Sequence, residues 1–311
     1  MLALVLATLS SAGFSISIRF AQRRGANLTV VGAVNYITAA VFHLVLTIVA
    51  GVHAPHGLTV AIGAVGGITF SWAFFLLFAV MKQRGVSITA AIMGLSVLVP
   101  VGISFLAWGE GATPLQTVGI AIAIISLPLL SIGPQKADSS KGKPGRVGAR
   151  GRAILSLAGL FLVNGTSLVA ARAFRQTGIR NEDPLFLLII FTSATITTLI
   201  VWAAQERALR RGRAAAAESG APAGAVGSLA VPLLFSAAPG VIVGLCNALS
   251  NRFIVMSLHS LPGIIVYPFY SAVGLVVMVA FSRIAWKEKI SPMEMIGMGL
   301  ACSSIVLINL V

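Results

Sequence analysis

The chain has 311 residues, 57% of them hydrophobic and only 10% charged, with a mean hydropathy of +0.97 and a formal net charge of +14. Because a soluble domain carries about 25% charged residues, this composition excludes a soluble globular protein and indicates a multi-pass membrane protein. The basic excess is therefore read as a signal of orientation in the bilayer, and no nucleic-acid partner is expected.

Ten apolar runs follow one another along the chain, each long enough for a helix of about 20 residues that crosses the hydrocarbon layer. They are interpreted as helices because backbone in lipid must satisfy its own hydrogen bonds. The first run begins directly after Met1 without the basic segment of a signal peptide, so we expect a retained span. The predicted spans cover residues 2–20, 30–51, 58–81, 86–107, 115–132, 153–173, 184–203, 231–257, 262–284 and 292–311.

Two polar segments interrupt the apolar pattern. Residues 133–152 form a basic stretch with Gly and Pro at mid-chain, which predicts a flexible linker. Residues 204–227 hold four arginines followed by an Ala/Gly/Pro tract, which predicts a disordered loop. The linker separates five predicted spans from five others, so it divides the chain into residues 1–132 and residues 153–311.

The two halves resemble each other in sequence. A shift of 178 residues without gaps superimposes several rare residues: Gly66 on Gly244, Gly85 on Gly263, Trp108 on Trp286, Glu110 on Glu288, Pro114 on Pro292 and Gly119 on Gly297. A repeat of five helices is odd-numbered, so the second copy crosses the membrane in the opposite sense to the first. The expected fold is an all-α membrane protein of two inverted five-helix repeats around a central cavity.

The distribution of basic residues predicts the orientation. The loops after the odd-numbered spans, with the adjoining span ends, hold 18 of the 22 Lys and Arg residues; the other side holds only Arg172, Arg175, Arg180 and Arg252. Because basic residues concentrate in cytoplasmic loops, the mid-chain linker is expected in the cytoplasm and both termini outside. The predicted location is the inner, or plasma, membrane.

Each half closes with a related motif. In the first half it is Trp108-Gly109-Glu110, then Pro114-Leu115-Gln116 and Gly119; in the second it is Trp286-Lys287-Glu288, then Pro292-Met293-Glu294 and Gly297. With the span count and the repeat, these motifs make the chain resemble the drug/metabolite transporter superfamily, in its ten-helix branch of paired EamA-type domains. The resemblance implies secondary or exchange transport of a small polar metabolite, with export as the expected direction. Members of that branch are usually described with both termini in the cytoplasm, which is opposite to the orientation that the basic residues predict.

The resemblance also bears on the substrate. Small multidrug relatives exchange protons for cations through a membrane-embedded Glu in their first helix, and the first span here contains none. Coupling of protons to a lipophilic cation by that route is therefore not expected, and the resemblance implies an amino acid or related carboxylate-bearing compound as the substrate. A drug or cation exporter, and a lipid flippase or lipid-binding component with an open lateral groove and basic residues at the interface, remain as alternatives.

Arg252 is the sharpest candidate for substrate binding. It lies inside the predicted span 231–257, where a charge near the bilayer centre costs about 2.5–3.5 kcal/mol and usually faces a cavity or a partner. No acidic residue lies deep in any predicted span, so Arg252 is a candidate contact for a substrate carboxylate or phosphate. Alternatively, its side chain snorkels to an interface or caps backbone carbonyls.

Other polar and aromatic residues at mid-span depth are candidates to line the cavity, because an Asn amide has four hydrogen-bonding capacities that lipid cannot satisfy. For each of them, hydrogen bonding between helices is the alternative role. His43 is a further candidate for proton coupling. The predicted substrate-binding set, besides Arg252, is Asn35, Tyr36, Trp72, Ser96, Asn164, Asn247, Asn251, Tyr267 and Tyr270.

Prolines and glycines within spans predict hinges. Pro100 and Pro268 interrupt the helical hydrogen-bond ladder, and Gly94 and Gly274 lie in the same two spans. Fixed kinks that serve packing are the alternative. Gly297 and Gly299 in the tenth span favour a close helix contact, and a monomer or a homodimer through spans 5 and 10 is compatible with the sequence.

Nothing in the sequence indicates an enzyme. The chain lacks the zinc-protease motif, the serine elbow and the ATP-binding loop, so no catalytic residue, cofactor or direct use of ATP is expected. The two cysteines, Cys246 and Cys302, both fall in apolar runs without metal-ligand spacing, so no metal site is expected.

Overall fold

The computed structural model describes residues 1–52, 54–84, 86–131, 147–179, 181–218, 233–286 and 291–309. All regular structure in these ranges is α-helical. The helices are α1 (Leu2–Arg23), α2 (Leu28–Val49), α3 (Gly57–Arg84), α4 (Val86–Leu95), α5 (Leu98–Trp108), α6 (Pro114–Ser131), α7 (Val147–Gln176), α8 (Asp183–Glu218), α9 (Leu233–Ser257), α10 (Gly263–Trp286) and α11 (Pro292–Asn309).

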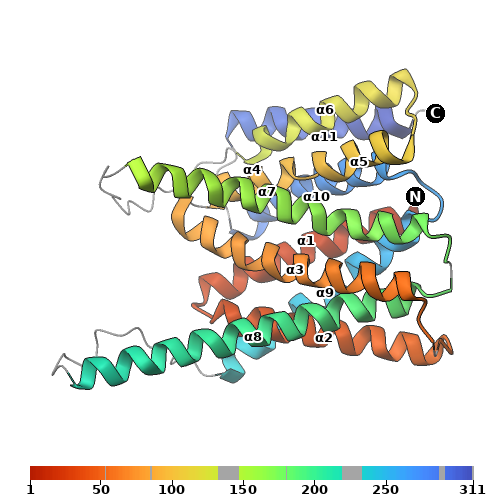
Figure 1. Cartoon of the computed structure of the whole chain (residues 1–311). Helices are drawn as coiled ribbons and strands as arrows, with labels where there is room; N and C mark the ends of the chain where they lie inside the picture. Colours follow the sequence, from red (N-terminus) through yellow and green to blue (C-terminus); the bar gives the residue numbers. More distant parts are fainter. Residues whose placement is uncertain are drawn as a thin grey trace.

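The helices run back and forth between two ends of the bundle (Figure 1). At the terminal end lie both chain termini and the connections around residues 50–56, 109–113, 177–182 and 258–262. At the linker end lie the turn between α1 and α2, the starts of α7 and α9, and the ends of α8 and α10.

Hydropathy and length identify the chain as a multi-pass membrane protein. Six helices, α1, α2, α3, α7, α8 and α9, have stretches of 22 to 26 residues that are long and apolar enough to cross a membrane. Four shorter apolar stretches lie in α4 to α5, α6, α10 and α11. The ten predicted spans therefore each coincide with a helix or, in one case, with two.

That one case is the fourth predicted span, residues 86–107, which is broken into α4 and α5 at Ser96 and Val97. Pro100 lacks the backbone N–H that would bond to the carbonyl of Ser96 in a continuous helix. The Ser96 carbonyl instead accepts a hydrogen bond from the Val99 N–H at 3.1 Å. Pro239 and Pro268, in contrast, lie inside the continuous helices α9 and α10.

The structure corrects both predicted polar segments. The disordered loop expected at 204–227 is wrong for residues 204–218, because α8 continues to Glu218. This stretch is rich in Ala, Arg, Glu and Gln, which are strong helix formers, and Glu206 pairs with Arg210 one turn later. The linker expected at 133–152 is too long at its end, since α7 begins at Val147; residues 133–146 and 219–227 lie outside the described ranges.

Helices from the two halves pack closely together. α9 packs against α1 and α2, α3 packs against α7 and α8, α2 packs against α8, and α6 packs against α11. Glycines permit two of these crossings: a Cβ added at Gly67 would lie 2.2 Å from the carbonyl oxygen of Ile190, and one at Gly244 would lie 2.7 Å from that of Asn35. Because lipid tails are as apolar as the side chains, such close backbone approach is what holds membrane helices together.

Candidate functional site

A buried ion pair joins the two halves at the terminal end. Glu110, in the connection after α5, pairs with Arg172 of α7, and their side chains are 7% and 14% exposed. The second carboxylate oxygen of Glu110 accepts a hydrogen bond from the N–H of Ile264, in the first turn of α10, at 3.0 Å. The Arg172 guanidinium also lies 5.7 Å from the ring centroid of Trp108. One carboxylate of the first half thus holds two helices of the second half.

A second cluster lies beside this pair. Asp183, in the first turn of α8, contacts the Arg175 guanidinium at 2.8 Å and Nε2 of His259 at 2.6 Å. A carboxylate at this position also complements the positive end of the helix dipole. Asp183 thereby ties together the end of α7, the start of α8 and the turn after α9.

A third contact crosses between the halves at the same end. Both carboxylate oxygens of Glu182 accept from the backbone N–H of His56, at 3.1 Å each, and His56 directly precedes α3. With Glu110 and Asp183, three of the eight acidic residues of the chain therefore lie at the terminal end. Each of the three contacts a neighbouring segment, so polar contacts join several segments at this end.

The asparagines predicted to line a cavity form one chain between α2 and α9. The Asn247 side-chain amide donates to Oδ1 of Asn35 at 3.1 Å, and the Asn251 amide donates to Oδ1 of Asn247 at 2.9 Å. The Nδ2 of Asn35 is buried without a hydrogen-bond partner in the described part of the chain. The structure therefore brings these three together, with one donor left to satisfy.

Four other predicted residues tie pairs of helices. The Asn164 amide of α7 donates to the Ser96 hydroxyl at the break between α4 and α5. The Tyr270 hydroxyl of α10 bonds with Ser250 of α9 at 2.9 Å. Tyr267 donates to the carbonyl of Leu168 at 2.8 Å, which links α10 to α7. These contacts correspond to the interhelical role that the sequence left open as the alternative.

Tyr36 and Trp72 differ from each other in position. The Tyr36 hydroxyl donates to the carbonyl of Phe70 at 3.0 Å, and its ring is buried against Phe74 and Phe191. Trp72 is 51% exposed and lines a cavity of about 440 Å³ between α2, α3 and α8, together with Thr29. Trp72 is thus separate from the Asn35 chain.

Arg252 lies at an edge of the contact between α2 and α9. Its Nη1 atom is buried and has no hydrogen-bond partner within the described ranges. In α2, the His43 ring stacks on Phe191 and bonds through Nδ1 to the carbonyl of Ala39 at 2.9 Å. Leu245 and Met256, which share its helix face by spacing, are 42% and 41% exposed. Part of Arg252 is therefore enclosed while its helix face borders the lipid-facing surface.

The predicted hinge residues fall in three helices. Gly94 lies in α4, just before the break at Ser96 and Val97, and Pro100 lies in the first turn of α5. Pro268 and Gly274 lie in α10, where a Cβ at Gly274 would be 3.8 Å from the Thr8 methyl group and so has room. Their role as hinges stays a prediction.

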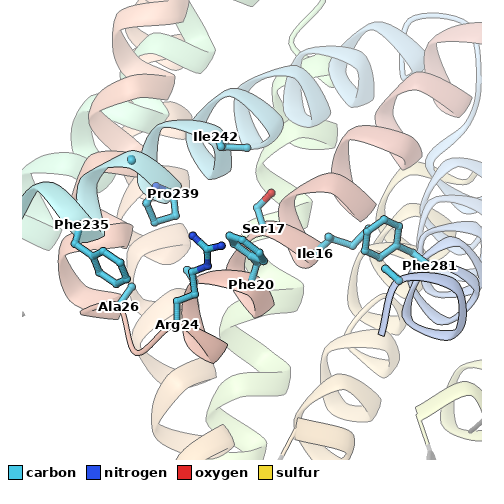
Figure 2. Close-up of a pocket in the computed structure, with 12 residues that line it drawn as sticks. Ile16, Ser17, Phe20, Arg24, Ala26, Phe235, Pro239, Ile242 and Phe281 are labelled. Carbon is cyan, nitrogen blue, oxygen red and sulfur yellow. The ribbon is translucent and has the colours of Figure 1, made fainter. Parts of the chain in front are cut away.

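The linker end contains an open groove of about 540 Å³ between α1, α9 and α10, shown in Figure 2. Its lining is apolar except for Ser17 and Arg24. The Arg24 guanidinium lies 4.2 Å from the ring centroid of Phe20 and is directed into the groove. We call this cavity the linker-end groove.

Sequence reasoning missed the terminal-end contacts as a site. Glu110 entered only as part of a motif, and Arg172 and Arg175 only as exceptions to the charge distribution. A usable signal was present: in a chain with eight acids, three of them fall in the connections that share a side with those arginines. His259 gave no such signal, since its partner Asp183 is 76 residues away.

Comparisons with known proteins agree with membrane transport. The model of the Small Multidrug Resistance protein family matches residues 234–301, which include most of α9, all of α10 and part of α11. Among curated proteins, no match is found. A solved structure titled "Crystal structure of protein" is similar with a TM-score of 0.67 and 14% identity, over 99% of this chain and 98% of the other. That likeness shows the fold alone, and the family match points to a membrane transporter rather than an enzyme.

Proposed function

We propose that this chain is a secondary carrier of the ten-helix, EamA-type plan, which exports a small carboxylate-bearing metabolite by alternating access between its two halves. The observation that carries the proposal is the difference between the two ends. At the terminal end Glu110 and Glu182 each join one half to the other, whereas at the linker end a cavity of about 440 Å³ lies between α2 and α3 of the first half and α8 of the second. A carrier closed at one end and open at the other has this form.

The helix contacts support an inverted repeat. The shift of 178 residues places α3 on α9, α4 with α5 on α10, and α6 on α11, and the order along each half pairs α1 with α7 and α2 with α8. The packing of α9 on α1 and α2 then corresponds to the packing of α3 on α7 and α8. The α2–α8 contact joins two helices that correspond to each other in the two halves, and the α6–α11 contact does the same. Such pairing is expected of two halves related by a twofold axis in the membrane plane.

The charges within the spans favour an anionic substrate. The stretch 234–286 contains Arg252 but no Asp or Glu. Among the described residues, a buried guanidinium nitrogen of Arg252 and the amide nitrogen of Asn35 have no hydrogen-bond partner, so both are donors for a carboxylate. The acids of the terminal end, Glu110 and Asp183, are already paired with arginines.

A drug or cation exporter is the second candidate, because the matched family is one of multidrug resistance proteins. Cation binding in that class requires an acid within the spans. Glu294 at the start of α11 is the acid nearest to a span within the matched stretch. The substrate screen below separates the two candidates.

Purified chain in proteoliposomes tests the substrate class. Counterflow is measured with amino acids, organic anions and organic cations, for the parent chain and for Arg252→Ala and Arg252→Lys. We expect transport of a carboxylate compound that Arg252→Ala lowers and Arg252→Lys partly restores. Selective cation transport that is unchanged in Arg252→Ala overturns the proposed substrate.

Alternating access has its own test. In a chain without native cysteines, Ser104→Cys reports on the buried terminal end and Thr29→Cys reports on the linker-end cavity between α2, α3 and α8. With a membrane-impermeant thiol reagent, we expect Thr29→Cys to react rapidly and Ser104→Cys slowly, and substrate to change the two rates in opposite directions. Rates that change together, or not at all, contradict the mechanism.

A further inference from the structure

The linker-end groove has the shape of a site for one hydrocarbon chain. Its volume of about 540 Å³ falls within the range of about 300–1,000 Å³ that is usual for small-molecule sites. The space exists because the facing residues are small: Ala21 on α1, Ala238 on α9 and Ala285 on α10 leave room between the larger side chains. A groove with apolar walls between membrane helices takes up an acyl chain in place of water.

The groove opens sideways toward lipid. Ile242, Phe235, Phe20 and Phe281 line it and are also 38% to 56% exposed on the outer surface of the bundle. Their helices contribute the last turns of α1 and α10 and the first turns of α9, so the groove lies close to the end of the membrane-spanning region. This is the depth at which a phospholipid changes from acyl chain to headgroup.

The charged side chain of Arg24 lies at the opening of the linker-end groove. Figure 2 shows Arg24 rising from the turn after α1, with its guanidinium between Phe20 and Pro239. Arg24 has no carboxylate partner among the residues that the structure describes. Its neighbours along the chain are basic as well, since Arg19 and Arg23 precede it.

We infer that the linker-end groove binds an anionic phospholipid, with an acyl chain between α1, α9 and α10 and the phosphate on Arg24. Two features select this occupant: an apolar channel that is open to the bilayer, and a cation at headgroup depth that has no carboxylate partner within the described ranges. The basic end of the protein is the one expected beside the anionic leaflet, where each Arg near the surface favours such lipids. The inference concerns binding and is independent of the proposed transport activity.

Native mass spectrometry of the full chain in detergent tests the site with phosphatidylglycerol and phosphatidylcholine of equal chain length. We expect phosphatidylglycerol to bind more tightly, and Arg24→Ala to lower that preference about fivefold. Ala238→Trp fills the groove and is expected to reduce binding of both lipids. Arg210→Ala, which removes an exposed charge on α8, is the matched control and leaves the preference unchanged.

Two results overturn the inference. One is an unchanged preference for phosphatidylglycerol in Arg24→Ala together with unchanged lipid binding in Ala238→Trp, which indicates that lipids bind elsewhere. The other is binding of oleate, but not of phosphatidylglycerol, in a manner that depends on Arg24. That result assigns the groove to a free amphiphilic anion. Far-ultraviolet circular dichroism of each variant establishes that the helices are intact.

Discussion

The two ends of the bundle are built in different ways. At the terminal end, Glu110, Glu182 and Asp183 each hold two or more segments together, and the side chains of Glu110 and Arg172 are nearly buried. At the linker end, small residues and Arg24 surround an open groove. The difference teaches that the two halves meet through an ion pair and a carboxylate–backbone contact at one end and border an apolar groove at the other, where the Asn27 N–H donates to the Ser236 hydroxyl at 3.0 Å.

Loss of the Glu110 charge, which removes the ion pair of the terminal end, is expected to lower the stability of the protein the most. Glu110→Gln leaves the guanidinium of Arg172 buried without its counter-ion, which destabilises a protein by about 3–5 kcal/mol. Thermal unfolding in detergent measures the loss. The double variant Glu110→Gln with Arg172→Gln removes both charges, and we expect it to be less destabilised than the sum of the single variants. Additive effects mean that the ion pair does not hold the terminal end.

A larger side chain at Gly165, where two helices approach closely, is expected to have the next largest effect on stability. A Cβ at Gly165 of α7 would lie 2.5 Å from the Val99 side chain and 2.9 Å from the carbonyl oxygen of Ser96. Gly165→Leu forces α7 away from the break between α4 and α5, at about 1–3 kcal/mol. We expect faster thiol labelling of Ser104→Cys at the terminal end in this variant. Gly159→Leu is the control, because a Cβ at Gly159 meets only a Leu76 methyl group at 3.8 Å.

The hydrogen bonds among Asn35, Asn247 and Asn251 test whether contacts in the middle of the bundle stabilise the protein independently of its two ends. Asn35→Ala removes the acceptor for Asn247 between α2 and α9, and an interhelical hydrogen bond in a membrane is worth about 0.6 kcal/mol. Asn251→Ala removes bonds within α9 only and serves as the comparison. Chemical unfolding in mixed micelles is expected to show the larger loss for Asn35→Ala. The reverse order assigns the stabilising role to α9 alone.

The smallest effect is expected outside the apolar part of the bundle. Glu206 and Arg210 form an exposed pair one turn apart on α8, which contributes about 0.3–0.5 kcal/mol to a helix. Glu206→Gln is therefore expected to leave thermal stability and counterflow nearly unchanged. A loss comparable with that of Glu110→Gln shows that the extension of α8 takes part in the carrier's closure.

Properties that depend on neighbouring residues were predictable from the sequence. The positions of the apolar spans follow from hydropathy, and the interruption near Pro100 follows from its missing N–H group. The failure at 204–218 also has a local cause, because arginines and alanines were read as signs of disorder although both residue types favour helices. Composition alone does not distinguish a solvated helix from a disordered tract.

The partners of the polar residues were decided only by the tertiary structure. Arg172 meets Glu110 across 62 residues, Asn247 meets Asn35 across 212, and the linker-end groove combines α1 with α9 and α10. These contacts depend on where two helices cross and on which helix faces are buried at the crossing. Glycines such as Gly67 and Gly244 allow the close approach at those crossings. Hydropathy is a property of each segment by itself, so the sequence determined a membrane bundle of apolar helices in two related halves. Where polar contacts join the segments, and where an apolar groove lies between them, was decided by how the helices pack.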